Sequence, residues 1–206
     1  MPVVALIAAM TLSSPAPAAR AGAADVLARM RAVNGSLQSY TARLHFYIKL
    51  HSFITLPIRI NGTLYSKRPD KSLLVFESVP KQAQAFKHFY ATRGTPETWP
   101  KSYRIELLDF ARPGTRVLRM FPKEKGSLDH ALITVDSRTY TEIHEDWLYH
   151  DGSSIRVDTK NDTVGGFLLP VHQEGDFDFP SYKAHVSADF EAYTLNPAIP
   201  DSIFKE

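Results

Sequence analysis

The sequence predicts a mainly β protein, with an open, curved antiparallel sheet of about ten strands and one helix near the N-terminus. Apolar and polar side chains alternate through most of the chain, which is typical of strands with one dry face. Turn-rich segments such as "RPGT" (112–115) separate these runs. Only one long amphipathic helix is found, and a helix of about 14 residues is about 20 Å long. It cannot cover ten strands, so the sheet must curl on itself and leave an apolar cleft.

The helix is predicted to begin at Asp25, which can cap it. From Val26 to Leu37 the apolar residues recur at spacings of four, three and four, so that they share one face. Asn34 and the glycine after it favour a left-handed end, which predicts that the helix stops between Asn34 and Ser39.

The strands are predicted from a period of two. In residues 40–50 the even positions are apolar, and the same rule returns in residues 54–64 after a turn of a few residues, which predicts an antiparallel hairpin. Residues 80–100 fit neither period, and a short helix from Lys81 to Tyr90 is the prediction there. Further strand-like runs occupy residues 72–78, 102–110, 115–121, 131–137, 139–150, 154–160, 164–173 and 182–195.

The last predicted strand has alanine at half of the positions expected to face inward, namely Ala184, Ala188 and Ala192. A tightly packed sheet normally needs larger residues to reach the density of a protein interior. The alanines therefore indicate either close approach of the helix or space left for a ligand, and the sequence leaves both interpretations open.

The first 24 residues resemble a secretory signal, and residues 25–206 are predicted to form a single domain. An apolar run from Val3 to Leu12, too short to span a bilayer, precedes small-residue cleavage motifs at 16–18 and 21–23. The chain has no cysteine, which excludes thiolate chemistry and a cysteine-linked lipid anchor. Its net charge of +2 gives no field that would favour nucleic acid. The prediction is an exported, soluble periplasmic protein without a transmembrane anchor.

Few residues carry a catalytic or metal-binding pattern. Glu142, His144 and Asp146 are expected on one strand face, where they could bind a metal, but a solvated polar face explains them better. Asp176 and Asp178 could form a carboxylate pair of the kind that glycosidases use, although such pairs are common by chance. The sequence therefore predicts a protein that is not an enzyme and that needs no cofactor and no metal.

The stretch "KRPDK" (67–71) separates two predicted strands and is interpreted first as a turn. Pro69 cannot donate a ladder hydrogen bond, so the strand must break there. A weaker interpretation is a basic rim that meets an anionic head group or a partner.

Several segments resemble the outer-membrane lipoprotein carrier family and its relatives in the LolA/LolB-like superfamily, which includes a sensor branch. These are "ADVLARMRAVNGSLQSYTARL" (24–44), "GTLYSKRPDKSLLVF" (62–76), "VDSRTYTEIHEDWLYHDGSSIRV" (135–157), "VGGFLLPVHQ" (164–173) and "YTLNPAIPDSIFKE" (193–206). The resemblance implies an unclosed half-barrel of about ten or eleven strands, with the helix over its concave face and an apolar cavity for acyl chains. Affinity there would come from burying methylenes, at about 0.8 kcal/mol each.

The first hypothesis is accordingly a periplasmic carrier or binding protein for lipoproteins, lipids or other acylated ligands, loaded and unloaded by envelope proteins. An envelope sensor or scaffold of the same fold, acting through protein contacts, is the alternative, and an enzyme at the Glu142 face is a third. The cavity is predicted to be lined by Leu44, Phe46, Ile48, Ile58, Ile60, Leu64, Val186 and Phe190.

Overall fold

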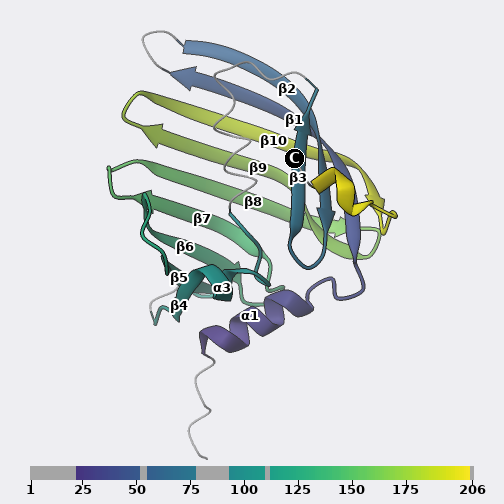
Figure 1. Ribbon diagram of the computed structural model, residues 1–206, viewed down its shortest axis with the longest axis horizontal. Coiled ribbons are helices and arrows are strands. Elements are labelled where there is room, and N and C mark those ends of the chain that lie inside the picture. Colours follow the sequence, from purple (N-terminus) through teal and green to yellow (C-terminus); the bar gives the residue numbers. More distant parts are fainter. Residues whose placement is uncertain (1–21, 52–54, 78–92, 110–111, 205–206) are drawn as a thin grey trace, which may run out of the picture.

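The computed structural model describes residues 22–51, 55–77, 93–109 and 112–204. Ten strands form a single antiparallel sheet in the order β3-β2-β1-β10-β9-β8-β7-β6-β5-β4 (Figure 1). Because β1 pairs with both β2 and β10, the first and last strands of the chain lie side by side. The strands are β1 (Ser39–His51), β2 (Thr55–Lys67), β3 (Lys71–Phe76), β4 (Tyr103–Leu107), β5 (Thr115–Pro122), β6 (Leu128–Asp136), β7 (Glu142–Tyr149), β8 (Ser154–Val164), β9 (Phe167–Phe179) and β10 (Tyr182–Leu195).

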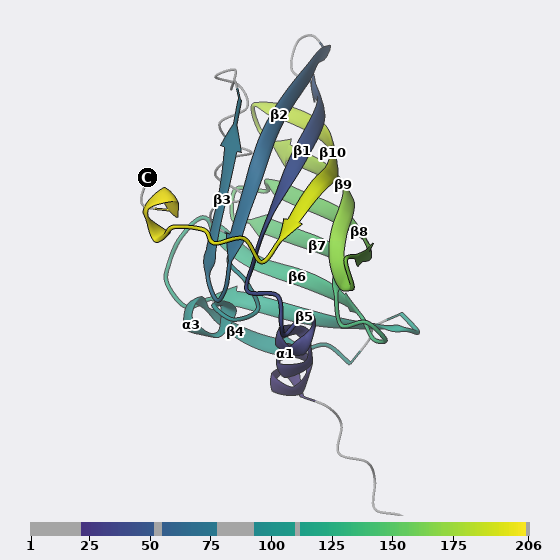
Figure 2. The ribbon, with the colours of Figure 1, turned by 90° about the vertical axis from the view of Figure 1, so that its right-hand side faces the viewer.

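The sheet is open and strongly curved. In the described part of the chain β3 and β4 stand at its two ends, each with one neighbouring strand. Figure 2 shows the strand direction turning progressively between these two ends, as the right-handed twist of neighbouring strands requires. The predicted fold class, a mainly β protein with an unclosed antiparallel sheet and an N-terminal helix, is confirmed.

The even positions of β1 from Ala42 to Ile48 face the core, as their alternation predicts. Leu44, Phe46 and Ile48 of β1 are buried, and the register places Ile60 of β2 opposite Phe46. Burying a side chain of this size contributes about 1.5–3 kcal/mol. A slip of one residue would expose the whole set to solvent, so this apolar pattern fixes the pairing of β1 with β2.

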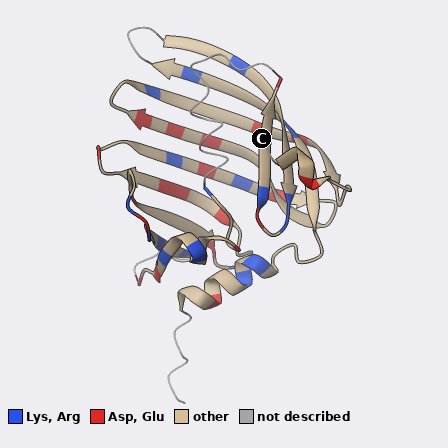
Figure 3. Cartoon of the chain, in the orientation of Figure 1, with Lys and Arg blue, Asp and Glu red and all other residues tan. Residues whose placement is uncertain are grey.

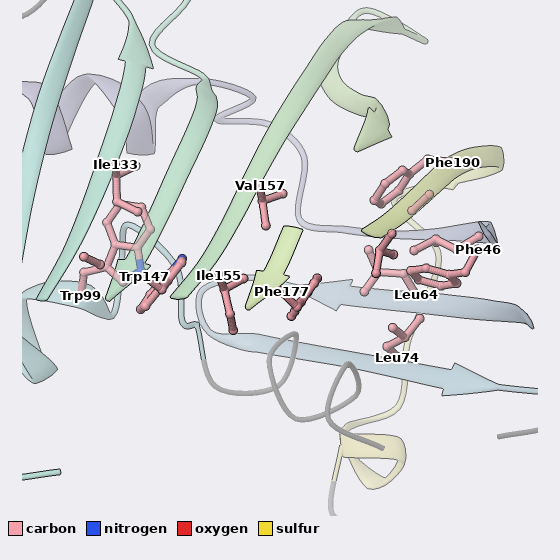
Figure 4. Packing of buried hydrophobic residues seen from close by; sticks show 14 of the residues in the cluster. Phe46, Leu64, Leu74, Trp99, Ile133, Trp147, Ile155, Val157, Phe177 and Phe190 are labelled. Carbon is pink, nitrogen blue, oxygen red and sulfur yellow. The ribbon is translucent and has the colours of Figure 1, made fainter. Parts of the chain in front are cut away.

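One core cluster runs along the inner face of the sheet. Figure 4 shows Trp99, Ile133 and Trp147 at one end of this cluster and Phe46 and Phe190 at the other. The same cluster includes buried residues of the N-terminal helix. In the described part of the chain the inner face is therefore largely packed, and one pocket beside it is described below.

The buried alanines of β10 lie beside larger side chains of the neighbouring strand. Ala184 and Ala188 are buried, and the register sets Ala188 directly opposite Phe46, whose ring needs room beside it. Ala192 does not face inward, so its predicted orientation is wrong: it is exposed and left-handed, with a φ of 48°. The register of β10 against β1 shifts there, which brings Tyr193 rather than Ala192 against the core.

The N-terminal helix α1 (Ala23–Ala32) lies at the end of the curved sheet, near β4 and β5 (Figures 1 and 2). It stops earlier than predicted, before Asn34, which has a left-handed φ of 57°. Asp25 caps it from within the first turn, where its carboxylate accepts a hydrogen bond from the Gly22 backbone N–H at 3.0 Å. The side chains that α1 buries are Val26, Leu27 and Met30.

The described residues also include two short helical segments, α3 (Trp99–Ser102) before β4 and the 3-10 helix η2 (Asp201–Phe204) after β10. The predicted helix from Lys81 to Tyr90 and residues 1–21 of the predicted signal lie outside the described residues. None of the helices in the described ranges has the length and apolarity that crossing a bilayer requires.

Candidate binding pocket

A pocket of about 320 Å³ opens where the C-terminal end of α1 meets the turn between β2 and β3. Its other walls come from residues 93–97, from the turn between β6 and β7, and from β8, β9 and β10. Pockets that hold small ligands measure about 300–1,000 Å³, so this one has room for a single chain or a compact group.

One wall of the pocket is apolar, and two of the predicted cavity residues, Leu64 and Phe190, lie in it. The other six lie elsewhere on the same inner face: Ile58 packs against the core, and the buried ones are Leu44, Phe46, Ile48, Ile60 and Val186. Contact of these residues with a ligand stays a prediction. The remaining apolar residues of the wall include Met30, Val33, Leu37, Leu168 and Leu169.

Arg93 and Glu142 also line the pocket, and with the buried Glu145 they form a charged cluster, which we call the Arg93 cluster. The Arg93 guanidinium forms ion pairs with both carboxylates, and its Nη2 lies 3.0 Å from Oε1 of Glu145. The indole N–H of Trp147 donates to the second oxygen of Glu145 at 2.9 Å. The Arg93 and Glu142 side chains are only 19% and 16% exposed, and Glu145 is fully buried. Two carboxylates thus share one guanidinium with little access to water.

The burial and the charges of this cluster change the pKa of Glu142. Burial raises the pKa of the Glu142 carboxyl to about 7; the Arg93 charge opposes this rise, and the nearby Glu145 charge adds to it. Burial also raises the pKa of Tyr40, which lies in the same pocket wall. Near neutral pH, therefore, Glu142 exists in both its protonated and its ionised form.

Glu142 reaches the inner face because β7 is bulged at its start. His144 pairs with Thr134 of β6, but Glu142 pairs with the very next residue, Val135, so one residue of β7 is extra. The expectation that Glu142, His144 and Asp146 share one face is therefore wrong for Glu142.

His144 and Asp146 remain on the outer face of the sheet. His144 bonds to Asp158 at 2.7 Å and to Asp146 at 3.1 Å. Burial alone would lower the pKa of His144, but these two carboxylates outweigh it and leave the pKa raised. Within the described ranges no group of three or more His, Asp or Glu residues is arranged to hold a metal.

The second carboxylate pair also lies on the outer face. Asp176 bonds to His185 at 2.9 Å and Asp178 to Lys183 at 2.6 Å. Figure 3 shows acidic and basic residues recurring along β7, β8 and β9. Each of these aspartates is thus engaged in a cross-strand ion pair typical of a solvated face.

Arg68 of the "KRPDK" turn binds the end of α1. Its guanidinium donates to the backbone carbonyls of Arg31 at 2.8 Å, Val33 at 3.3 Å and Asn34 at 3.0 Å. It also forms an ion pair with Glu97 at 3.1 Å. A cation at this place satisfies carbonyls that have no partner within the helix and complements the helix dipole. Arg68 therefore fixes α1 and residues 93–97 to the β2–β3 turn, on one side of the pocket.

Lys67 and Lys71, at the two ends of the turn, stand directly opposite each other in the register. Such a pair of like charges repels. Asp201 of η2 lies 2.6 Å from each ammonium group, and the two lysines lower its pKa to about 2. Lys67 also donates to the Ile199 carbonyl at 2.9 Å. The anion at this turn is thus a carboxylate of the chain itself.

Arg93 was missed by the sequence analysis because residues 80–100 show no periodicity. The buried Trp99, whose indole N–H donates to the Arg93 carbonyl at 3.0 Å, was missed for the same reason. A tryptophan within a polar segment of an otherwise β chain is the one signal that could have pointed to a buried anchor there.

The comparisons with known proteins support the fold. No protein-family model and no curated protein sequence matches the chain. A DUF1329 family protein from Desulfovibrio piger superposes with a TM-score of 0.64 at 12% identity, covering 88% of this chain and 95% of that one. A LolA superfamily protein from Nitrosomonas europaea gives 0.62 at 11% identity, covering 90% and 98%.

A domain from Vibrio parahaemolyticus, described as an outer membrane lipoprotein-sorting protein, gives a TM-score of 0.64 at 11% identity and covers 88% of this chain and 95% of that one. Each likeness extends over nearly the whole length of both chains. At these identities the likeness concerns the fold, and the fold is the one that the sequence motifs predicted: this chain has the fold of the LolA superfamily and of the lipoprotein-sorting proteins related to it.

Proposed function

We propose that this protein is a periplasmic carrier or binding protein that holds the apolar chain of a lipid, a lipoprotein or another acylated ligand, without catalysis. One observation carries the proposal: a pocket with an apolar wall remains at the end of an otherwise packed inner face, bounded by α1 and the β2–β3 turn. The lipoprotein-sorting description of the Vibrio parahaemolyticus domain agrees with this function.

The geometry suggests how a chain would be held and released. The apolar wall buries methylenes, each contributing about 0.8 kcal/mol. One side of the pocket is held by hydrogen bonds and ion pairs of Arg68 with α1 and with Glu97, and these can break and form again without disturbing the sheet. Envelope proteins that load and unload the cargo are part of the proposal, as is a single domain over residues 25–206 after a cleaved signal.

The test is uptake of dansylated undecanoic acid by protein that has been freed of lipid by extraction. Leu168 lines the pocket and is only half-buried, so Leu168→Glu places a charge in the apolar wall with little cost to folding. We expect it to reduce probe binding at least about tenfold. Leu56→Glu is the matched control, because Leu56 is 41% exposed and far from the lining residues in the register.

Absence of probe binding by the wild type, together with native mass spectra free of bound lipid, would overturn the proposal. In that case the alternative predicted from the sequence, an envelope sensor or scaffold acting through protein contacts, becomes the better account. It would be tested by isolating stable protein complexes from the cell envelope.

A further inference from the structure

Two members of the Arg93 cluster line the same pocket as the apolar residues, and the proposed carrier function gives the cluster no role. Both Arg93 and Glu142 line the pocket. A ligand whose chain lies against Leu64 and Phe190 therefore shares the pocket with a guanidinium and a carboxyl group that its other end can contact. This arrangement bears on the kind of head group that the pocket accepts.

The cations that line the pocket in the described part of the chain are Lys67, Arg68, Lys71 and Arg93, and their partners differ. The guanidinium of Arg68 is bound to carbonyls of α1 and to Glu97, and the ammonium groups of Lys67 and Lys71 are bound to Asp201. The Arg93 guanidinium, by contrast, pairs with two carboxylates: Glu142, which also lines the pocket, and Glu145, which is fully buried.

The charge balance of the cluster decides what can bind there. With both carboxylates ionised, the cluster carries one net negative charge, and a further anion would be repelled at low dielectric. If Glu142 takes up a proton, an anionic group can pair with Arg93, and the cluster together with this anion still carries one net negative charge. The neutral carboxyl group then becomes a hydrogen-bond donor to that same anion.

We propose that the pocket selects amphiphiles with an anionic head group, a carboxylate or a phosphate, and that this head group pairs with Arg93 while Glu142 takes up one proton from solvent. This proposal rests on the carrier function proposed above and specifies its ligand. No covalent bond changes. The ligand supplies the negative charge that Glu142 gives up, and Glu145 keeps the second ion pair with Arg93.

The groups around Glu142 are compatible with this exchange. Besides Arg93 and Glu145, the charged or titratable groups that act on it are Glu97 of the 93–97 segment and Tyr40 of β1. On β8, Asn161 donates to the backbone carbonyl of Glu142 at 2.8 Å, which holds the main chain while the carboxyl changes state.

Among the described residues, two further charged groups near the pocket come from α1, and each has a partner that lines it. The Arg29 guanidinium lies 5.1 Å from the centre of the Tyr140 ring, and Arg31 donates to the Pro96 carbonyl at 3.0 Å. The raised pKa of Glu142 fits a group that gains and loses a proton near neutral pH.

The experiment measures displacement of a neutral, environment-sensitive fluorescent probe by decanesulfonate, whose charge is constant across the neutral range. The wild type should bind decanesulfonate about tenfold more weakly for each pH unit above about 7, because each binding event consumes a proton. Calorimetry in two buffers of different ionisation enthalpy should show uptake of about one proton at about pH 8 and almost none at about pH 6.

Glu142→Gln keeps the shape and the hydrogen-bond donor but cannot exchange a proton, so its affinity for decanesulfonate should not depend on pH. Glu97→Gln is the matched control, because Glu97 also acts on Glu142 yet pairs with Arg68, and the pH dependence should persist in it. A wild-type affinity that is independent of pH, or that strengthens as pH rises, would overturn the proposal.

Two further experiments distinguish failure of the carrier function from failure of the head-group proposal. Decanol tests the apolar residues alone, so if neither decanol nor decanesulfonate displaces the probe, the carrier function itself fails. If both bind with equal affinity at every pH, only the head-group proposal fails. Competition between decanoate and decyl phosphate then distinguishes a free fatty acid from a phosphate-bearing lipid as the source of the anion.

Discussion

The two faces of strand β7 carry the same kinds of side chain in opposite settings. On the inner face Glu142 and Glu145 share Arg93 in the wall of a pocket, with at most 19% of each side chain exposed. On the outer face His144 and Asp146 exchange hydrogen bonds with each other and with β8, where the side chain of Asp158 is 74% exposed. The difference shows that the role of an acidic residue here depends on the face it reaches, and a single bulge decides which face that is.

The largest expected effect comes from removing the inner cation. Arg93→Met should destabilise the fold by about 3–5 kcal/mol at about pH 8, because it leaves a buried carboxylate without its partner. The outer-face counterpart is Arg156→Met, which removes an ion pair with Asp146 at 3.5 Å and should cost less than about 1 kcal/mol. Urea unfolding measures the loss of unfolding free energy in both variants. Equal losses would show that an ion pair contributes the same stability on the two faces.

The second effect is a dependence of stability on pH that belongs to the inner face. The pKa of Glu142 is raised to about 7 by burial, so the folded state holds a proton that the unfolded state has already lost. Stability should therefore fall as pH rises from about 4.5 to about 7, by about 2–3 kcal/mol.

Glu142→Gln should remove this fall and should be more stable than the wild type at about pH 8. The outer-face control is Asp146→Asn, in which the fall should remain. Unfolding free energies measured across this pH range test both variants, and a fall that persists unchanged in Glu142→Gln would disprove the assignment.

Arg68 is an intermediate case, with 28% of its side chain exposed. Arg68→Ala should cost about 2 kcal/mol, since hydrogen bonds from a charged group to carbonyls contribute more than neutral ones but water can replace part of them here. Lys183→Ala, which breaks an exposed ion pair with Asp178, should cost clearly less. Thermal unfolding compares the two, and a larger loss in Lys183→Ala would contradict this account.

The smallest effect is expected on the outer face. His172 bonds to Asp189 at 2.6 Å and to Glu174 at 3.4 Å, and the Asp189 hydrogen bond raises its pKa. Its stabilisation should be fully present below about pH 6.5 and should be lost as pH rises through the raised value. His172→Gln should therefore cost less than about 1 kcal/mol in mild acid and almost nothing at about pH 9. High salt should abolish the loss of stability that His172→Gln causes in mild acid. A loss that persists in high salt would mean that the His172–Asp189 pair is not solvated.

The alternation of side chains was enough to predict the sheet. In a strand every second side chain lies on the same face, so burial of one face produces a period of two in the sequence. It placed Leu44, Phe46 and Ile48 on the inner face correctly. It failed at Ala192 and Glu142 because each lies at a bulge, where an extra residue changes which side chains face inward without changing the types of residue.

The pocket itself was only half predictable. Leu64 and Phe190 follow from their strands, whereas the role of Arg68 depends on the place where a helix ends far away in the sequence. Arg93 comes from a segment without periodicity, so its two partners on β7 could not be inferred. Long-range pairing of single charged groups leaves no local pattern, which is why the chemistry of this site became visible only in three dimensions.

The contacts of Arg68 also bear on the order in which the chain folds. Its partners at the end of α1 are 34 to 37 residues away, so these hydrogen bonds close a long loop of chain. Because loop closure costs entropy before the contact is gained, we expect them to form after the transition state. Arg68→Ala should accordingly leave the refolding rate nearly unchanged and accelerate unfolding, which stopped-flow measurements would reveal. Docking of α1 would then be the last step of folding and the first to be undone, so the helix beside the pocket can come loose while the sheet remains intact.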